Sequence, residues 1–172
     1  HIVEELKQAT YVSDIIIGLD QADEAQYLAA KEYFSVLPQR HHILWNDGPR
    51  LQAVNSRLAA LSLAPAERGK GCNVWYCLGY LQALGSIDVV ALHDCDITTY
   101  DRSLLARLLY PVASPQVNYK FSKGYYARIA SGKLNGRVSR LLVSPLIRAM
   151  KKLSDDHHYL DYLDSFRYPL AG

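Results

Sequence analysis

The sequence has few of the features that mark membrane, secreted or fibrous proteins. No apolar run reaches the roughly 18 residues of a membrane-crossing helix. The three cysteines, Cys72, Cys77 and Cys95, are odd in number and lack the spacing of a disulfide framework or a zinc site. Repeats and low-complexity tracts are absent as well. These absences exclude collagen, coiled coil and disorder for the whole chain, and they predict a cytoplasmic protein without a membrane partner.

The composition is that of a globular domain with one core. The chain has 172 residues, of which 49% are hydrophobic and 21% charged. It opens inside a helix-like segment, however, whereas an α/β domain usually opens with a central strand. We therefore expect residues 1–172 to form a single domain that is a fragment, lacking its first strand and its C-terminal part.

Short apolar runs alternate with helical patterns along the chain, which predicts an α/β fold with a mainly parallel sheet flanked by helices. The clearest buried strand is residues 87–92, Ile-Asp-Val-Val-Ala-Leu. Further strands are predicted at 14–19, 42–45, 117–121 and 124–129, and helices at 22–34, 50–63, 73–84, 101–109, 138–152 and 159–166.

The sharpest chemical feature is His93-Asp94-Cys95-Asp96, directly after the strand predicted at 87–92. Ligands of α/β sheets bind beyond the carboxyl ends of strands. Carboxylates on a tight turn suit Mg²⁺ or Mn²⁺, which can bridge the phosphates of a nucleotide. Asp94 and Asp96 could equally cap the turn, and both interpretations stay open at this point.

Two glycine-bearing loops could hold an anion. In Arg68-Gly69-Lys70-Gly71 the glycines let the backbone approach a phosphate that the lysine neutralises, although a solvated turn is the simpler interpretation. The second loop, Gly136-Arg137-Val138-Ser139, leads into a predicted helix. Free backbone N–H groups at a helix start, with an arginine and a hydroxyl beside them, suit a phosphate or a carboxylate.

The charge is unevenly distributed. Residues 120–152 contain nine basic residues and no acidic one, in a chain whose formal net charge is only +2. Such a block needs negatively charged partners, either acidic side chains elsewhere in the chain or an anionic ligand. Aromatic residues interleave with the basic ones, so RNA binding is an alternative hypothesis.

Taken together and in order, these motifs resemble the glucosyl-3-phosphoglycerate synthases and the related mannosyl enzymes, which are retaining glycosyltransferases with a GT-A fold. The resemblance runs from about Asp14 to Gly172 and depends on the co-occurrence of Gly69-Lys70-Gly71, Asp94-Cys95-Asp96 and Gly136-Arg137-Val138-Ser139. The family's opening nucleotide-contacting strand would lie before His1, and a histidine that completes its metal site would lie after Gly172.

The resemblance implies a role for each of these residues. Asp96 is the metal ligand, for Mg²⁺ or Mn²⁺, and Asp94 and Asp96 are the catalytic carboxylates. Gly136, Arg137, Val138 and Ser139 hold the acceptor. The donor-binding residues are Gly18, Leu19, Asp20, Lys70, Asp94, Cys95 and Asp96.

The implied activity is transfer of a hexose, glucose or mannose, from UDP-glucose or GDP-mannose to D-3-phosphoglycerate, with retention at the anomeric carbon and without nucleic acid as a partner. A homodimer is one oligomeric state that the sequence leaves open. The alternative is a noncatalytic nucleotide-binding or RNA-associated α/β module that uses residues 120–152.

Overall fold

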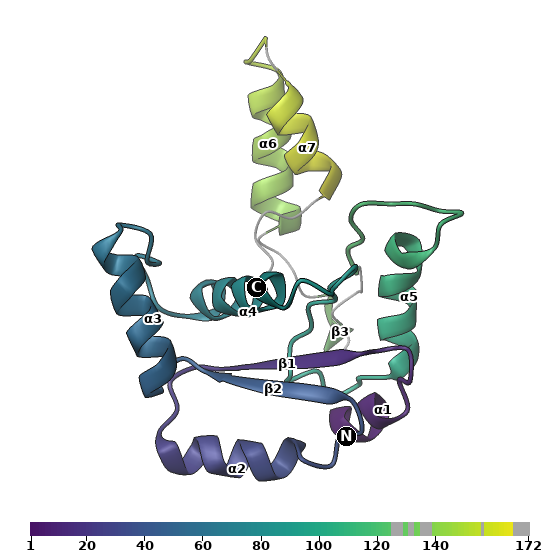
Figure 1. Ribbon diagram of the computed structural model, residues 1–172. Helices are drawn as coiled ribbons and strands as arrows, with labels where there is room; N and C mark the ends of the chain where they lie inside the picture. The colour runs from purple at the N-terminus through teal and green to yellow at the C-terminus, as the bar shows by residue number, and fades with distance from the viewer. Residues whose placement is uncertain (125–128, 131–132, 135–138, 156, 167–172) are drawn as a thin grey trace. The chain divides into compact units, whose positions relative to one another are not determined.

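The computed structural model describes the chain except for residues 125–128, 131–132, 135–138, 156 and 167–172 (Figure 1). The chain divides into two compact units, residues 1–123 and 124–172, and we describe each by itself. None of the helices in the described ranges is long and apolar enough to cross a membrane.

The first unit alternates helices with two strands. In chain order it contains α1 (Ile2–Lys7), β1 (Asp14–Leu19), α2 (Glu24–Phe34), β2 (Arg40–Trp45), α3 (Pro49–Ala60), α4 (Lys70–Leu84) and α5 (Arg102–Ala113). The strand predicted at 14–19 is confirmed at both ends, and the one at 42–45 begins two residues earlier.

The two strands form a parallel pair, in register from Asp14 opposite Arg40 to Leu19 opposite Trp45. Helix α4 packs on β1 and α2 packs on β2, on opposite sides of the pair (Figure 1). Because the strands are parallel and in register, their carboxyl ends lie at the same edge of the sheet.

The helix starts follow the local sequence. Asp23 and Gln26 form a capping box at the start of α2, and Asp101 caps α5, because its side chain accepts from the Ser103 amide. Helix α4 begins at Lys70, three residues before the predicted start, because Gly69 precedes it at φ 120°, a conformation that glycine adopts readily.

The buried strand predicted at residues 87–92 is wrong. The segment is irregular, and Val90 and Leu92 are 47% and 60% exposed. Its side chains alternate between half-buried and exposed, as in an extended chain, but in the described part of the chain no strand lies beside it. Without a neighbour its backbone groups cannot form a ladder. The mainly parallel sheet is accordingly confirmed only as the β1–β2 pair.

The strand predicted at residues 117–121 is wrong as well. The chain turns there, because the Asn118 and Tyr119 amides donate to Ser114 and Pro111 at the end of α5. Pro111 lies within the last turn of α5, so the helix lacks the hydrogen bond that an amide at this position would donate to the carbonyl of Arg107.

Ala9, Tyr100 and Leu105 form the best-buried cluster of the first unit, with Ala91 packed at its margin. Tyr100 is only 1% exposed, and its burial, the largest cause, raises the pKa of its hydroxyl to about 12. This cluster anchors the segment that leads from residue 91 to α5.

The second unit contains β3 (Ile129–Ala130), β4 (Lys133–Leu134), a π-helical turn η1 (Ser139–Val143), α6 (Ser144–Lys151) and α7 (His158–Phe166). Pro145 is tolerated because it lies in the first turn of α6. Across the α6–α7 pair, Lys151 lies 2.6 Å from Asp161 and Arg148 lies 3.5 Å from Asp164. The anionic partners of Arg148 and Lys151 are therefore acidic side chains of the same unit.

The packing of α4 on β1 can be tested at two glycines. A methyl group at Gly18 would collide with the Asn73 side chain, whereas one at Gly79 on the exposed side of α4 meets nothing within 4 Å. We expect Gly18→Ala to lower the free energy of unfolding by about 1–3 kcal/mol through overpacking. Gly79→Ala, the matched control, should raise it by about 0.5–1 kcal/mol through helix propensity. Urea denaturation followed by circular dichroism measures both, and equal effects would contradict this packing.

Candidate functional site

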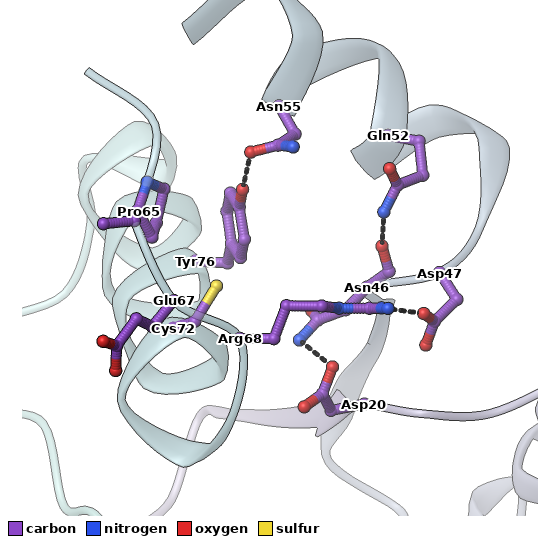
Figure 2. Close-up of a pocket in the computed structure, with 11 residues that line it drawn as sticks. Asp20, Asn46, Asp47, Gln52, Asn55, Pro65, Glu67, Arg68, Cys72 and Tyr76 are labelled. Carbon is purple, nitrogen blue, oxygen red and sulfur yellow. Dashed lines mark hydrogen bonds and ion pairs between the residues drawn. The ribbon is translucent and has the colours of Figure 1, made fainter. Parts of the chain in front are cut away.

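A polar pocket lies at the carboxyl ends of β1 and β2, beside the start of α4 (Figure 2). Its volume is about 480 Å³, within the usual range of small-molecule sites. The residues that line it are Asp20, Asn46, Asp47, Gln52, Asn55, Pro65, Ala66, Glu67, Arg68, Cys72 and Tyr76.

The strand register brings the polar residues of this pocket together. Asp20 follows β1, and Asn46 and Asp47 follow β2, whose last residue lies opposite Leu19. The Asn46 amide donates to the Leu19 carbonyl at 2.8 Å, which extends the pairing by one residue. Asp20 therefore lies beside Asn46, which is 26 positions away in the chain.

Asn73 of α4 connects the helix to both strand ends. Its Nδ2 donates to the Gly18 carbonyl at 3.1 Å, which fixes its Oδ1 as an acceptor. The Asn46 Nδ2 donates to that Oδ1 at 3.2 Å and to Asp20 Oδ1 at 3.3 Å. Asn46 is 5% exposed, so this network holds the floor of the pocket in one arrangement.

The Asp47 side chain has partners on two segments that border the pocket. Its carboxylate accepts from the Ala22 amide at 3.1 Å and pairs with Arg68, the residue before Gly69. Burial acts to raise the pKa of Asp47, but the hydrogen bonds from Ala22 and Arg68 outweigh it and hold the pKa below 3.8. The Asp47–Arg68 ion pair thus connects the end of β2 to the loop that begins α4.

Two of the predicted donor-binding residues meet directly. The Lys70 Nζ, on the first residue of α4, lies 2.7 Å from Asp94 Oδ1. The side chains are 56% and 37% exposed, so both remain accessible from solvent. The structure thus brings the Gly-Lys-Gly loop and the Asp-Cys-Asp turn together, although they are far apart in the sequence.

The Asp-Cys-Asp turn offers oxygen ligands but not a complete metal site. Cys95 and Asp96 are exposed, and Asp94 is half-buried. Within the ranges that the structure describes, no group of three or more His, Cys, Asp or Glu side chains could hold a metal ion. Two accessible carboxylates fit Mg²⁺ or Mn²⁺ when phosphate oxygens and water complete the shell.

His93 points away from this chemistry. Its ring packs edge-on against Tyr100 at 5.4 Å between ring centres, and burial lowers its pKa. We conclude that His93 is a structural residue. Cys95 is exposed as a residue, but neighbouring atoms partly desolvate its sulfur, and this desolvation, followed by the charges of Asp94 and Asp96, raises the pKa of the thiol.

The predicted acceptor residues fall in the second unit. Gly136, Arg137 and Val138 lie outside the described residues, and Ser139 is the first residue of η1. Their roles stay a prediction.

Asn46, Asp47 and Asn73 were not predicted as site residues. The sequence context of the first two, Asn46-Asp47-Gly48-Pro49, is that of an ordinary turn. Their position directly after the second strand, matching that of Asp20 after the first, is the signal that could have identified them.

The Asp47–Arg68 ion pair predicts that the stability of the folded chain depends on pH. Because the pKa of Asp47 is lowered in the folded chain, its contribution to stability is present above pH 3.8 and is lost as the pH falls through the folded-state value. We expect Asp47→Asn to be less stable than the native chain at about pH 7, and the difference to shrink as the pH falls below 3.8 and through the folded-state pKa. Urea midpoints measure this difference, with Asp88→Asn on an exposed position as the control. A difference that persists in acid would contradict the assignment.

Two curated enzymes of the same name are similar in sequence to this chain. No family model and no solved structure matches the chain. A glucosyl-3-phosphoglycerate synthase of Persephonella marina is 43% identical over 171 residues, and one of Methanococcoides burtonii is 39% identical over 175 residues. Each alignment covers 99% of this chain and 42% of the relative. The chain therefore spans less than half the length of the curated relatives it matches, and along nearly all of its own length it is glucosyl-3-phosphoglycerate synthase-like.

Proposed function

We propose that the protein carrying this chain transfers a hexose, glucose or mannose, from a nucleotide sugar to D-3-phosphoglycerate, with retention at the anomeric carbon. The names of both relatives support the product class. A GT-A architecture is part of the proposal, and the parallel β1–β2 pair between helices is consistent with it.

The observation that carries the proposal is the contact between Lys70 and Asp94 beside the polar pocket. Arg68 and Cys72 line the pocket, so Lys70 lies between them at the same end of α4. A ligand with an uncharged group at one end and an anionic group at the other could place the uncharged group in the pocket. Its anionic group would then lie at the start of α4, beside Lys70. A nucleoside diphosphate sugar is such a ligand.

Within this arrangement the chain supplies attraction for a diphosphate. Helix α4 has no side-chain cap, so the first backbone N–H groups and the positive end of its dipole are available to an anion. The Lys70 ammonium adds a full charge, although it already pairs with Asp94. These groups would stabilise the negative charge that grows on the departing diphosphate.

Asp96 would hold a Mg²⁺ or Mn²⁺ ion, with Asp94 as a donor contact. A bound divalent ion neutralises charge on the diphosphate oxygens. In the acceptor loop, Arg137 would pair with the phosphate or carboxylate of 3-phosphoglycerate, with Gly136, Val138 and Ser139 beside it. As the resemblance implies for such retaining enzymes, the acceptor hydroxyl would attack on the same face as the leaving group.

The rival hypothesis of an RNA-associated module loses part of its support. It needs the basic residues of 120–152 to face a polyanion. Arg148 and Lys151 instead pair with Asp164 and Asp161 within the second unit.

We expect Lys70→Met to weaken binding of a nucleoside diphosphate by about ten-fold to a hundred-fold, because one charge-assisted contact is lost. Calorimetric titration of the full-length protein with Mg²⁺ present measures the dissociation constant. Lys7→Met is the matched control, because Lys7 is a surface residue of the same unit that pairs only locally with Glu4. Equal constants for the native protein and Lys70→Met would contradict the proposed donor site.

Turnover separates the donor and acceptor roles. We expect Asp96→Ala to abolish release of nucleoside diphosphate that depends on 3-phosphoglycerate, and Arg137→Ala mainly to raise the KM for the acceptor. Small and equal effects of both changes would contradict these roles. Absence of acceptor-dependent release with every donor would overturn the enzyme proposal, and metal-independent RNA binding that weakens with salt would favour the rival.

A further inference from the structure

The loop that joins α3 to α4 forms one wall of the polar pocket. It comprises residues 61–69, of which Pro65, Ala66, Glu67 and Arg68 line the pocket. None of the residues 61–69 is buried, since each of them is half-buried or exposed. Apolar packing therefore contributes little to holding this wall in place.

One polar contact ties the second half of this loop to the strand ends. In the part of the chain that the structure describes, the pairing of Arg68 with Asp47 is the only hydrogen bond or ion pair formed by residues 64–68. Figure 2 shows the Arg68 side chain directed from the loop toward the Asp47 carboxylate. The attachment of this half of the loop therefore depends on a single arginine.

Asp47 provides a fixed anchor for that arginine. Its carboxylate also accepts from the Ala22 amide at 3.1 Å, and the amide of the preceding residue, Asn46, donates to the Leu19 carbonyl at 2.8 Å. Only 24% of the Asp47 side chain is exposed, against 66% of the Arg68 side chain. The pair thus joins an ordered strand end to an exposed loop.

The end of this loop also sets where α4 begins. Arg68 precedes Lys70, the first residue of α4, by two positions, and Gly69 lies between them at φ 120°. The helix has no side-chain cap, and a methyl group at Gly69 would meet nothing within 4 Å. Because glycine has access to many backbone conformations, Gly69 does not fix the loop by itself. Without the pairing of Arg68, the pocket wall beside Lys70 is free to move.

We propose that Arg68 is a positioning residue of the donor site, which by pairing with Asp47 holds residues 64–68 as a fixed wall beside the bound nucleotide sugar. The inference rests on the proposed function, and it adds a residue to which the sequence motifs assign no role. A loop that is ordered before the ligand arrives loses little conformational freedom on binding. The pair therefore raises affinity without touching the ligand.

The first test needs no ligand. Asp47→Asn keeps an oxygen for the Ala22 amide and leaves the loop sequence unchanged, but it removes the charge that holds Arg68. We expect a glutamate-specific protease to cleave the full-length variant after Glu67 about ten-fold faster than the native protein, because the loop opens locally. Mass spectrometry of the fragments measures the rate. Cleavage after Glu32, within α2, is the internal control and should change much less.

The second test measures binding by calorimetric titration of the full-length protein with UDP and with GDP, in the presence of Mg²⁺. We expect Asp47→Asn and Arg68→Gln each to weaken the tighter of the two nucleotides by about five-fold to ten-fold. The double variant should bind no more weakly than either single variant, because both changes break the same pair. Arg68→Lys, which can still pair with Asp47, should keep most of the affinity. Arg57→Gln, at an exposed position of α3 outside the pocket, is the matched control.

The outcomes separate this inference from the proposed function. A loss that is much larger for Arg68→Gln than for Asp47→Asn, or losses that multiply in the double variant, would mean that Arg68 contacts the ligand itself and would overturn the positioning role. Unchanged affinity in both variants, or equal acceleration of cleavage after Glu67 and Glu32, would overturn it as well. Each of these results leaves a native protein that binds a nucleoside diphosphate, so the proposed function stands. If neither UDP nor GDP binds to the native protein, the proposed function itself fails.

Discussion

The hydrogen bonds of Asn73 are the constraint on which the candidate site depends. From α4 this side chain reaches the Gly18 carbonyl of β1 and the Asn46 amide beyond β2, so one residue sets the helix against both strands. Gly18 has no side chain to obstruct that approach. The same contact places the start of α4, with Lys70, next to the polar residues that follow the strands. Loss of this network would separate the pocket from the lysine that the proposed function needs.

The polar groups of the pocket are arranged as a network rather than as isolated residues. Asp47 is held by Ala22 and Arg68, while Gln52 holds the backbone of Asn46. Such a network keeps its charged groups ordered without a ligand, which reduces the reorganisation that binding requires.

Some elements followed directly from local sequence. The apolar run at residues 14–19 and the helical patterns after it fixed β1, α2 and α3 within a few residues, because periodicity and capping act over short distances. The error at residues 87–92 has the opposite cause. A run of apolar and β-branched residues can form a strand only beside another strand, and in the described part of the chain this segment has none. Its residues alternate between half-buried and exposed, so neither the burial nor the pairing that was predicted is found.

The sequence by itself determined which residue types could bind an anion or a metal: Lys70 between two glycines, and Asp94 and Asp96 on one turn. It also determined the similarity to glucosyl-3-phosphoglycerate synthases, since that rests on ordered motifs and identity. Only the tertiary structure decided that Lys70 contacts Asp94 and that Asn46, Asp47 and Arg68 share a pocket with Asp20. The reason is physical: these contacts join residues 21 to 27 positions apart, and strand register and helix packing, not local propensity, bring such residues together.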